Sequence, residues 1–310
     1  MTTRAAIIDL GTNTFKLLVC EPHAGKLRVL HREEVPVYLG RGGIEQGVIV
    51  PEAFARGIAA LHALRERATI LGASDVRGFG TSALRNASNG AEFTRHALEV
   101  TGIAIGIVPG EEEAALIIAG VRQAVPFGAR PALVMDIGGG STEFILATEK
   151  AIIWKRSFEL GVTRLRERIP SSDPMTLEEE SRIAAHLDDR LEPLYAMIER
   201  HEPHLLIGSA GSFDTLAAIV SAANNDPIAA EDTSLEFDAD SFAEMKDRLL
   251  RMPRAERLQV PGLPEHRVDT IPYALVQIDR VLLAGRIREL AWSRFALKEG
   301  AAARMLFGVR

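Results

Sequence analysis

Two short glycine-rich segments carry the residue types best suited to phosphate chemistry. They read Asp9-Leu-Gly-Thr-Asn-Thr-Phe15 and Asp136-Ile-Gly-Gly-Gly-Ser-Thr-Glu143, and each starts with an aspartate that ends an aliphatic run. Because glycine has no Cβ atom, the backbone N–H groups of such a loop can approach an anion closely. A carboxylate at the end of a strand can hold a hydrated magnesium ion against the same phosphate. We therefore predict that these two loops bind phosphate together with magnesium.

The residues expected to take part fall into two groups. Those offering backbone N–H groups or hydroxyls to phosphate are Gly11, Thr12, Asn13, Thr14, Gly138, Gly139, Gly140, Ser141 and Thr142. The expected magnesium ligands are Asp9, Asp136 and Glu143. Each loop leads into a strand and the chain has no Gly-Lys-Ser/Thr, which excludes a Walker A loop. Each loop alone is also compatible with a simple hairpin turn, but two matching loops favour phosphate binding.

Two further features could contact phosphate. In Gly208-Ser-Ala-Gly-Ser212 a strand is expected to pass into a helix, whose N-terminus is an anion site. We therefore add Gly208, Ser209, Gly211 and Ser212 to the expected phosphate-binding residues. Arg85 follows the end of another expected strand, and its guanidinium keeps its charge and can bind two oxygens at once. The alternative for Arg85 is an ordinary solvent-exposed arginine on a helix.

The acidic run Glu111-Glu112-Glu113 is the best source of a group that activates a water molecule. Carboxylates are favoured at the start of a helix, and this explanation suffices for Glu111 and Glu112. Glu113 differs because it heads the row Glu113, Ile117, Val121 on the apolar side of the expected helix. A carboxylate without a role is costly there, so we predict that Glu113 is the catalytic base.

Composition restricts the class of protein. The chain has 310 residues, is 47% hydrophobic and 25% charged, and carries a net charge of −6. These values predict a globular protein without a nucleic-acid tail, in which local groups must hold any polyanion. Cys20 is the single cysteine, which excludes a disulfide framework and a cysteine-based zinc site. Without a signal pattern or an apolar run of roughly 20 residues, we expect a soluble cytoplasmic protein with no membrane association.

The order of expected elements indicates two related α/β halves. Residues 5–10, 15–20 and 27–38 are expected strands, and a long helix over 51–71 follows. Residues 132–136, 144–147 and 151–158 repeat the strand meander, and the rest of the chain is mostly helical. We therefore predict an N-terminal domain over residues 1–123 and a C-terminal domain over residues 124–310.

An ordered set of segments resembles the exopolyphosphatase and guanosine pentaphosphate phosphatase (Ppx/GppA) family, within the actin, sugar kinase and chaperone ATPase superfamily. Besides the two loops, the resemblance is carried by Gly80-Thr-Ser-Ala-Leu-Arg-Asn-Ala-Ser-Asn89, Pro109-Gly-Glu-Glu-Glu-Ala114, Leu160-Gly-Val-Thr-Arg-Leu165, Gly208-Ser-Ala-Gly-Ser212 and Gly262-Leu-Pro-Glu-His-Arg-Val-Asp-Thr-Ile271. The match runs nearly from end to end. One departure is Lys298, which stands where family members often have arginine and loses its bidentate geometry.

The resemblance implies a fold, a reaction and roles for residues. The fold is two actin-like (ribonuclease H-like) α/β domains with an interdomain cleft, and the reaction is magnesium-dependent hydrolysis of terminal phosphoanhydride bonds. The resemblance points to Glu113 as the base and to Arg85 as a phosphate contact. It assigns metal and water positioning to Asp9, Asp136 and Glu143 together. Relatives suggest a homodimer, and the length implies a short form without the additional C-terminal helical module of longer members.

Several functions remain open from the sequence. Inorganic polyphosphate is the leading substrate, and guanosine pentaphosphate (pppGpp) or another nucleotide is the alternative for the same machinery. A small-molecule kinase of the superfamily would need an acceptor site, for which the chain offers no candidate motif. A non-enzymatic actin-like protein would form filaments, or bind nucleotide without turnover.

Overall fold

The computed structural model describes residues 4–308, which fold into two compact units. The first unit comprises the chain up to Gly120 together with the segment from Phe295 onward, and the second comprises Val121–Arg294. The expected C-terminal domain, residues 124–310, includes the last helix of the chain, whereas the second compact unit ends at Arg294. The last helix packs on the sheet of the first unit, because its buried alanines fit against that sheet. Helical pattern alone could not show where this helix docks.

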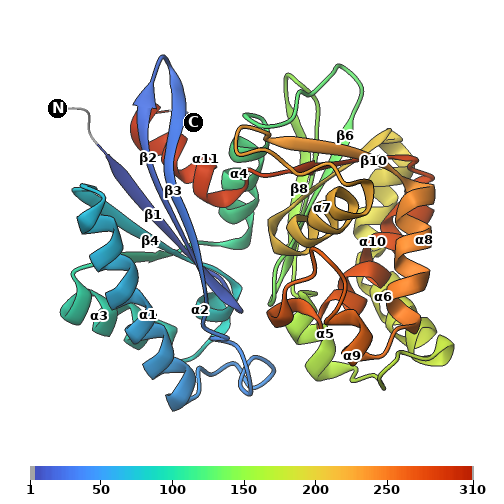
Figure 1. Ribbon diagram of the computed structural model, residues 1–310, viewed down its shortest axis with the longest axis horizontal. Helices are drawn as coiled ribbons and strands as arrows, with labels where there is room; N and C mark the ends of the chain where they lie inside the picture. The colour runs from blue at the N-terminus through green and yellow to red at the C-terminus, as the bar shows by residue number, and fades with distance from the viewer. Residues whose placement is uncertain (1–3, 309–310) are drawn as a thin grey trace. The chain divides into compact units, whose positions relative to one another are not determined.

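The first unit contains a five-stranded sheet in the order β3-β2-β1-β4-β5 (Figure 1). Its strands are β1 (Ala5–Leu10), β2 (Thr14–His23), β3 (Lys26–Pro36), β4 (Asp75–Gly80) and β5 (Ala104–Ile107). The first three form the expected antiparallel meander, and β4 and β5 are added in parallel to β1. Strand β1 is central and its aliphatic side chains are fully buried, as a continuous apolar run predicts.

Helices cover both faces of this first sheet. They are α1 (Pro51–Ile70), α2 (Ser82–Asn86), α3 (Gly90–Thr101), α4 (Gly110–Val121) and α11 (Leu297–Phe307). Ile8 and Leu10 point into the core formed with α1 and α3. Because side chains alternate along a strand, Asp9 lies on the opposite face, where α11 packs on β1 and β2.

The second unit contains a six-stranded sheet in the order β10-β11-β9-β6-β7-β8. Its strands are β6 (Ala132–Ile137), β7 (Thr142–Ala147), β8 (Ile152–Phe158), β9 (Leu205–Ser209), β10 (Ser234–Asp238) and β11 (Glu289–Ser293). Strands β6, β7 and β8 form a second antiparallel meander, and β9 and β11 extend it in parallel. The order β8-β7-β6-β9-β11 thus repeats the order of the first sheet, with β10 added at the edge. The expected duplicated α/β fold is confirmed.

The helices of the second unit are α5 (Val162–Arg168), α6 (Leu177–His201), α7 (Ala210–Asn224), α8 (Ala239–Arg251), α9 (Arg254–Arg257) and α10 (Ile271–Gly285), and residues Glu265–Arg267 form a single 3₁₀ turn. The first eight residues of helix α10 are all buried, and the helix packs against α6 and α8 (Figure 1). The sequence predicted mostly helix in this part of the chain, but α10 ends at Gly285. Arg286 adopts a left-handed conformation with φ 49° that ends the helix, and β11 follows.

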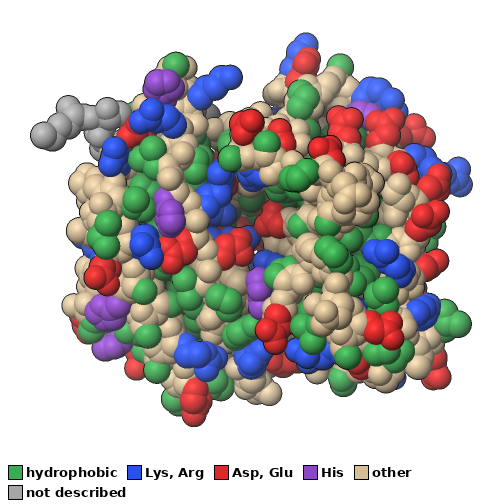
Figure 2. Space-filling view, in the orientation of Figure 1, with side chains coloured by type: hydrophobic (Ala, Val, Ile, Leu, Met, Phe, Trp, Pro, Cys, Tyr) green, Lys and Arg blue, Asp and Glu red, His purple; other side chains and the backbone are tan. Residues whose placement is uncertain are grey.

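The face of the molecule shown in Figure 2 has no broad region of positive charge alone. On the face shown in Figure 2, Lys and Arg side chains are interspersed with Asp and Glu over both units. This distribution agrees with the net charge of −6. Any phosphate chain must therefore be bound by local groups. Among the described residues, no helix has the length and apolar character needed to cross a membrane.

Candidate active site

The first loop turns its carbonyl groups toward one side. The N–H of Gly11 donates to the Thr14 carbonyl across 3.1 Å and closes the turn between β1 and β2. The carbonyl of Thr12 accepts from the N–H of Gly40, and that of Asn13 accepts from two N–H groups in residues 37–38. In a trans peptide the N–H points opposite to the preceding carbonyl. The N–H groups of Asn13 and Thr14 are therefore directed away from the 37–40 segment, as an anion-binding loop requires.

The second loop repeats this arrangement with a different support. The carbonyls of Gly138, Gly139 and Gly140 all accept hydrogen bonds from N–H groups of residues 161–164, over 2.8–3.2 Å. The following N–H groups, those of residues 139–141, consequently point away from α5. Both loops are thus held by their carbonyls in a conformation that directs N–H groups to the opposite side. This shared geometry supports the predicted phosphate role, which stays a prediction for the individual residues.

Close packing of α5 on the second loop depends on Gly161. A Cβ atom at this position would lie 2.4 Å from the carbonyl carbon of Gly139 and from the nitrogen of Gly140. Any side chain would therefore push the loop away from the helix. The side chain of Arg164 adds a second support, because its Nε donates to the Gly140 carbonyl at 3.0 Å and its Nη2 to Glu159 at 2.9 Å.

The two carboxylates of the second loop lie side by side on adjacent strands. Asp136 and Glu143 are directly opposite each other in the β6–β7 ladder, and both are buried. The hydroxyl of Ser209 donates to Asp136 and that of Ser157 donates to Glu143, each across 2.7 Å. Ser157, Glu143, Asp136 and Ser209 thus form one row across β8, β7, β6 and β9.

This row fits a divalent cation. Two like charges directly opposite each other in a sheet repel, and a cation between them would remove that repulsion. Magnesium prefers carboxylate oxygens and is commonly bound through one or two of them, together with water and phosphate oxygens. In the described part of the chain no three His, Cys, Asp or Glu side chains gather into a complete cage. Asp136 and Glu143 are two carboxylates of the kind that magnesium can share with a phosphate, and the magnesium site stays a prediction.

Asp9 is the carboxylate of the first unit, and it also fits a ligand role. Its Oδ1 is enclosed and has no hydrogen-bond partner among the described residues. Burial raises the pKa of this carboxyl group, against the opposing effects of Lys298 and Lys16. An enclosed carboxylate oxygen without a donor is costly unless a cation or a donor reaches it. The other two expected ligands, Asp136 and Glu143, belong to the second unit. Binding of one magnesium ion by all three carboxylates therefore stays a prediction.

Glu113 and Arg85 form a largely buried ion pair in the first unit. Nη1 of Arg85 donates to Oε2 of Glu113 at 2.7 Å and to the Val108 carbonyl at 2.9 Å. The two side chains are 17% and 8% exposed, respectively. The alternative of a solvent-exposed arginine therefore does not hold. Burial of Glu113 near the start of α4 agrees with the apolar helix face predicted from the sequence, and its role as base stays a prediction.

Helix α11 supports the helix that carries Glu113. A Cβ atom at Gly300 of α11 would lie 1.9 Å from the Leu116 carbonyl, and one at Gly120 would lie 2.0 Å from the Ala296 carbonyl. The backbones of α4 and α11 therefore touch at two glycines. Arg304 adds an ion pair to Glu112, which gives this glutamate a structural partner.

The strand-to-helix segment 208–212 has mixed roles. The hydroxyl of Ser209 is engaged with Asp136, so it orients a carboxylate. Gly208 is required by packing, because a Cβ there would lie 1.8 Å from the ring of Phe213. A Cβ at Gly211 would lie 1.7 Å from Nη2 of Arg267. Ser212 is buried in the first turn of α7, and phosphate binding by this segment stays a prediction.

Sequence reasoning did not single out Arg164, Ser157 and Arg267. Two of them stand in segments that carried the resemblance, namely 160–165 and 262–271. In the sequence, these two arginines could have been recognised as charged residues within glycine-containing motifs. Ser157 had no such signal, because only the register of β7 and β8 places it beside Glu143.

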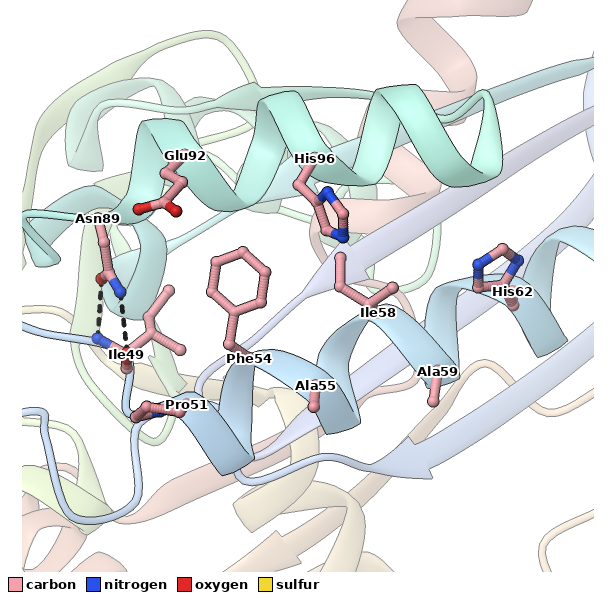
Figure 3. Close-up of a pocket in the computed structure, with 10 residues that line it drawn as sticks. All are labelled: Ile49, Pro51, Phe54, Ala55, Ile58, Ala59, His62, Asn89, Glu92 and His96. Atoms are coloured by element: carbon pink, nitrogen blue, oxygen red, sulfur yellow. Dashed lines mark hydrogen bonds between the residues drawn. The ribbon is translucent and has the colours of Figure 1, made fainter.

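A separate cavity of about 650 Å³ lies on the first unit between α1 and α3 (Figure 3). Phe54, Ile58 and the imidazoles of His62 and His96 line it. The side chain of Asn89 accepts a hydrogen bond from the N–H of Ile49 and donates one to the Ile49 carbonyl. None of the predicted site residues lines this cavity, so it plays no part in the candidate active site.

Comparison with known proteins places these observations in a family. The sequence profile of the Ppx/GppA phosphatase family matches residues 18–307, which include Arg85, Glu113 and the whole second loop. The chain belongs to this family. The resemblance stated from the sequence is confirmed, and with it the expected class of enzyme, a phosphoanhydride hydrolase.

Ppx/GppA relatives cover nearly the whole chain. Exopolyphosphatase 2 of Mycobacterium tuberculosis is 34% identical over 93% of this chain and 92% of its own length. The crystal structure of an exopolyphosphatase from Cytophaga hutchinsonii is 36% identical, covers 99% of both chains and has a TM-score of 0.96. A Ppx/GppA family member from Aquifex aeolicus is 22% identical and has a TM-score of 0.83 over 99% of both chains, which shows the shared fold.

Proposed function

We propose that this protein is an exopolyphosphatase, which removes terminal phosphate from inorganic polyphosphate with the help of magnesium. The observation that carries the proposal is the matched geometry of the two loops, whose carbonyls are tied back so that N–H groups point the other way. The names of the relatives from Mycobacterium tuberculosis and Cytophaga hutchinsonii support polyphosphate as the substrate.

The reaction transfers the terminal phosphoryl group to water. The water oxygen forms a bond to the terminal phosphorus while the bridging P–O bond breaks, so that orthophosphate and a chain shorter by one phosphate result. Glu113 accepts the proton of the attacking water. Arg85 holds the carboxylate of Glu113 in place, and its positive charge stabilises the charge on the phosphoryl oxygens.

The loops and carboxylates bind and neutralise the phosphate chain. The N–H groups of residues 13–14 and 139–141 bind phosphate oxygens, and the hydroxyls of the same loops add donors. Asp136 and Glu143, together with Asp9, would hold magnesium. When bound, the metal supplies positive charge that stabilises the phosphoryl oxygens in the transition state. Ser209 and Ser157 orient the two carboxylates of the second unit.

A substrate panel tests this proposal. Phosphate release is measured with short and long polyphosphates, guanosine pentaphosphate and simple nucleotides at one magnesium concentration. We expect polyphosphate to be hydrolysed most efficiently and EDTA to abolish the reaction. Faster turnover of guanosine pentaphosphate would instead establish the alternative substrate. Transfer from ATP to a small acceptor, or filaments without turnover, would overturn the proposal.

Magnesium binding needs a readout apart from activity. Titration calorimetry of the protein with magnesium, in the presence of orthophosphate, is expected to show binding that Asp136→Asn weakens. We also propose a cytoplasmic homodimer. Light scattering after size exclusion tests the dimer, and a mass equal to one chain would contradict it.

A further inference from the structure

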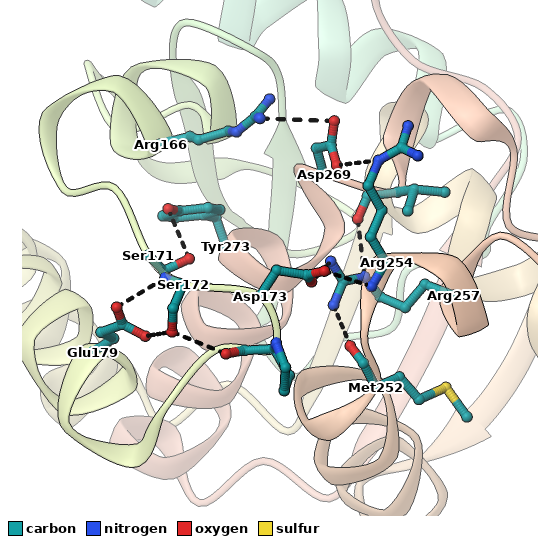
Figure 4. Close-up of polar contacts among 12 residues, drawn as sticks. Arg166, Ser171, Ser172, Asp173, Glu179, Met252, Arg254, Arg257, Asp269 and Tyr273 are labelled. Carbon is teal, nitrogen blue, oxygen red and sulfur yellow. Dashed lines mark hydrogen bonds and ion pairs between the residues drawn. The ribbon is translucent and has the colours of Figure 1, made fainter.

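A second cavity, of about 440 Å³, lies in the second unit and is lined by three arginines. Figure 4 shows the polar contacts of these arginines. Its lining comes from Arg166 of α5, the segment 170–175, α9, Asp269 and the start of α10. None of the residues predicted for the phosphate loops, the metal or the base lines it. Its volume is within the range of small-molecule sites, roughly 300–1,000 Å³.

One side of this cavity is rigid. Arg257 is only 4% exposed, and three of its nitrogens donate to protein groups: Nε to the Val268 carbonyl, Nη1 to the Met252 carbonyl and Nη2 to Asp173. The other oxygen of Asp173 accepts from the backbone N–H of Arg254 at 2.8 Å. Arg257 and Asp173 thus fix the wall of the cavity and neutralise each other's charge.

The other two arginines share one carboxylate at the cavity. Nε of Arg254 donates to Asp269 at 2.9 Å, and Nη2 of Arg166 lies 3.7 Å from the same side chain. Arg166 and Arg254 are 47% and 43% exposed. Each guanidinium has five N–H donors. Within the described residues, the guanidiniums of Arg166 and Arg254 make one hydrogen bond between them, from Nε of Arg254 to Asp269. Most donors of these two guanidiniums are therefore available to a ligand.

The charged residues that line the cavity favour an anionic ligand. The lining contains three arginines and two aspartates, which is a net positive site on a chain of net charge −6. Two guanidiniums that share one counterion are suited to a ligand with several oxygens and more than one negative charge. The fork of a guanidinium pairs with phosphate or carboxylate oxygens two at a time, and an oligophosphate offers several such oxygens in a row.

We propose that this cavity is a second anion-binding site, which takes a short oligophosphate between Arg166 and Arg254. The choice of oligophosphate rests on the proposed function, whereas the preference for a polyvalent anion rests on the cavity itself. The ligand displaces Asp269 from the two guanidiniums. Arg166 and Arg164 stand on the same short helix, so the occupied cavity also steadies the helix that holds the second phosphate loop.

Calorimetry with a non-hydrolysable ligand tests the proposal. The protein is titrated with a methylene-bridged triphosphate, and in a second arm with a methylene-bridged nucleoside triphosphate, to separate a free phosphate chain from a nucleotide. We expect two bound ligands per chain in the first arm. The double variant Arg166→Gln/Arg254→Gln is expected to bind one, because each lost arginine weakens the second site about tenfold.

Matched variants separate this site from general effects of charge. Arg190→Gln/Arg288→Gln removes two exposed, ion-paired arginines of the same unit outside the cavity and is expected to bind two ligands. Asp269→Asn removes the competing carboxylate and is expected to tighten the second site several-fold, which a folding defect would not do. Unchanged stoichiometry in the Arg166→Gln/Arg254→Gln variant, or weaker binding in Asp269→Asn, overturns the proposal. Failure of the proposed function would instead appear in the substrate panel, with two bound ligands retained.

Discussion

Nη1 of Arg85 donates to Oε2 of Glu113 across 2.7 Å within the first unit, where Glu113 is buried and Arg85 is largely buried. Arg85 comes from the short helix after β4, whereas Glu113 comes from the first turn of α4. The pair therefore joins two elements that follow neighbouring parallel strands. An arginine that also donates to the Val108 carbonyl has little freedom to move, so it fixes the orientation of the Glu113 carboxylate.

Glu113→Gln tests the assignment of the catalytic base. Glutamine keeps the shape of the side chain and an oxygen that accepts from Arg85, but it cannot take a proton from water. We expect phosphate release to fall by about 10²–10⁴-fold, the usual contribution of a general base. Circular dichroism should show that the variant is folded at the assay temperature, although loss of the charge paired with Arg85 lowers the free energy of unfolding. A folded variant that keeps most of the rate would show that another group is the base.

Removal of Arg85 is expected to cost both stability and activity. Arg85→Gln leaves the buried carboxylate of Glu113 without its cation, which costs about 3–5 kcal/mol in comparable pairs. The double variant Arg85→Gln/Glu113→Gln removes both charges and should recover most of that loss while remaining inactive. Urea denaturation of the two single variants and the double variant measures the coupling. Additive effects in this cycle would contradict an energetic link between the two side chains.

The sequence was sufficient to predict the loops, the two strand meanders and the burial of Glu113. These features depend on short apolar runs, on glycine and on the helical row from Glu113 to Val121, and such local patterns are readable. The ion pair of Arg85 with Glu113 was not predicted, because it joins residues 28 positions apart. The docking of α11 on the first sheet was not predicted either, because a helical pattern shows which face of a helix is buried but not against which sheet.

Arg164→Ala is expected to loosen the second phosphate loop. The variant loses the charged hydrogen bond to the Gly140 carbonyl and the contact with Glu159, although backbone N–H groups of α5 still hold the loop. We expect a loss of about 1.5–3 kcal/mol in the free energy of unfolding and a larger increase in KM than decrease in kcat. Arg164→Lys keeps the charge and should restore part of both. A fall in stability with unchanged KM would assign Arg164 a purely structural role.

Glu179 predicts a dependence of stability on pH. Its carboxylate accepts from the N–H of Thr176 at 2.9 Å and from both the hydroxyl and the N–H of Ser172. These bonds lower the pKa of Glu179 from 4.5 to about 2. Because the folded pKa lies below the unfolded one, the stabilisation is complete above pH 4.5 and is lost as the pH falls toward 2.

The role of Glu179 is measured by comparing the parent protein with one variant at two pH values. Urea midpoints of the parent protein and of Glu179→Gln are determined at about pH 6 and about pH 3. The parent should be the more stable protein at the higher pH, and the difference should shrink at the lower pH. Glu178→Gln, one residue away in the same first turn, serves as the control and should show a smaller change. An equal difference at both pH values would be inconsistent with a lowered pKa.

Cys20, the single cysteine, should be inert in the folded protein. Its side chain is fully buried in β2, and burial together with the charge of Glu299 raises the pKa of the thiol to about 12. At about pH 8 only roughly one thiol in ten thousand is then ionised, and thiolate is the reactive form. We expect a thiol-reactive chromogen to label the protein only as fast as it unfolds, and fully in urea. Labelling at the rate of free cysteine under native conditions would contradict the packing of β2 against α11. If labelling does follow unfolding, its rate measures how often the last helix leaves the first sheet, because α11 covers that face of β2.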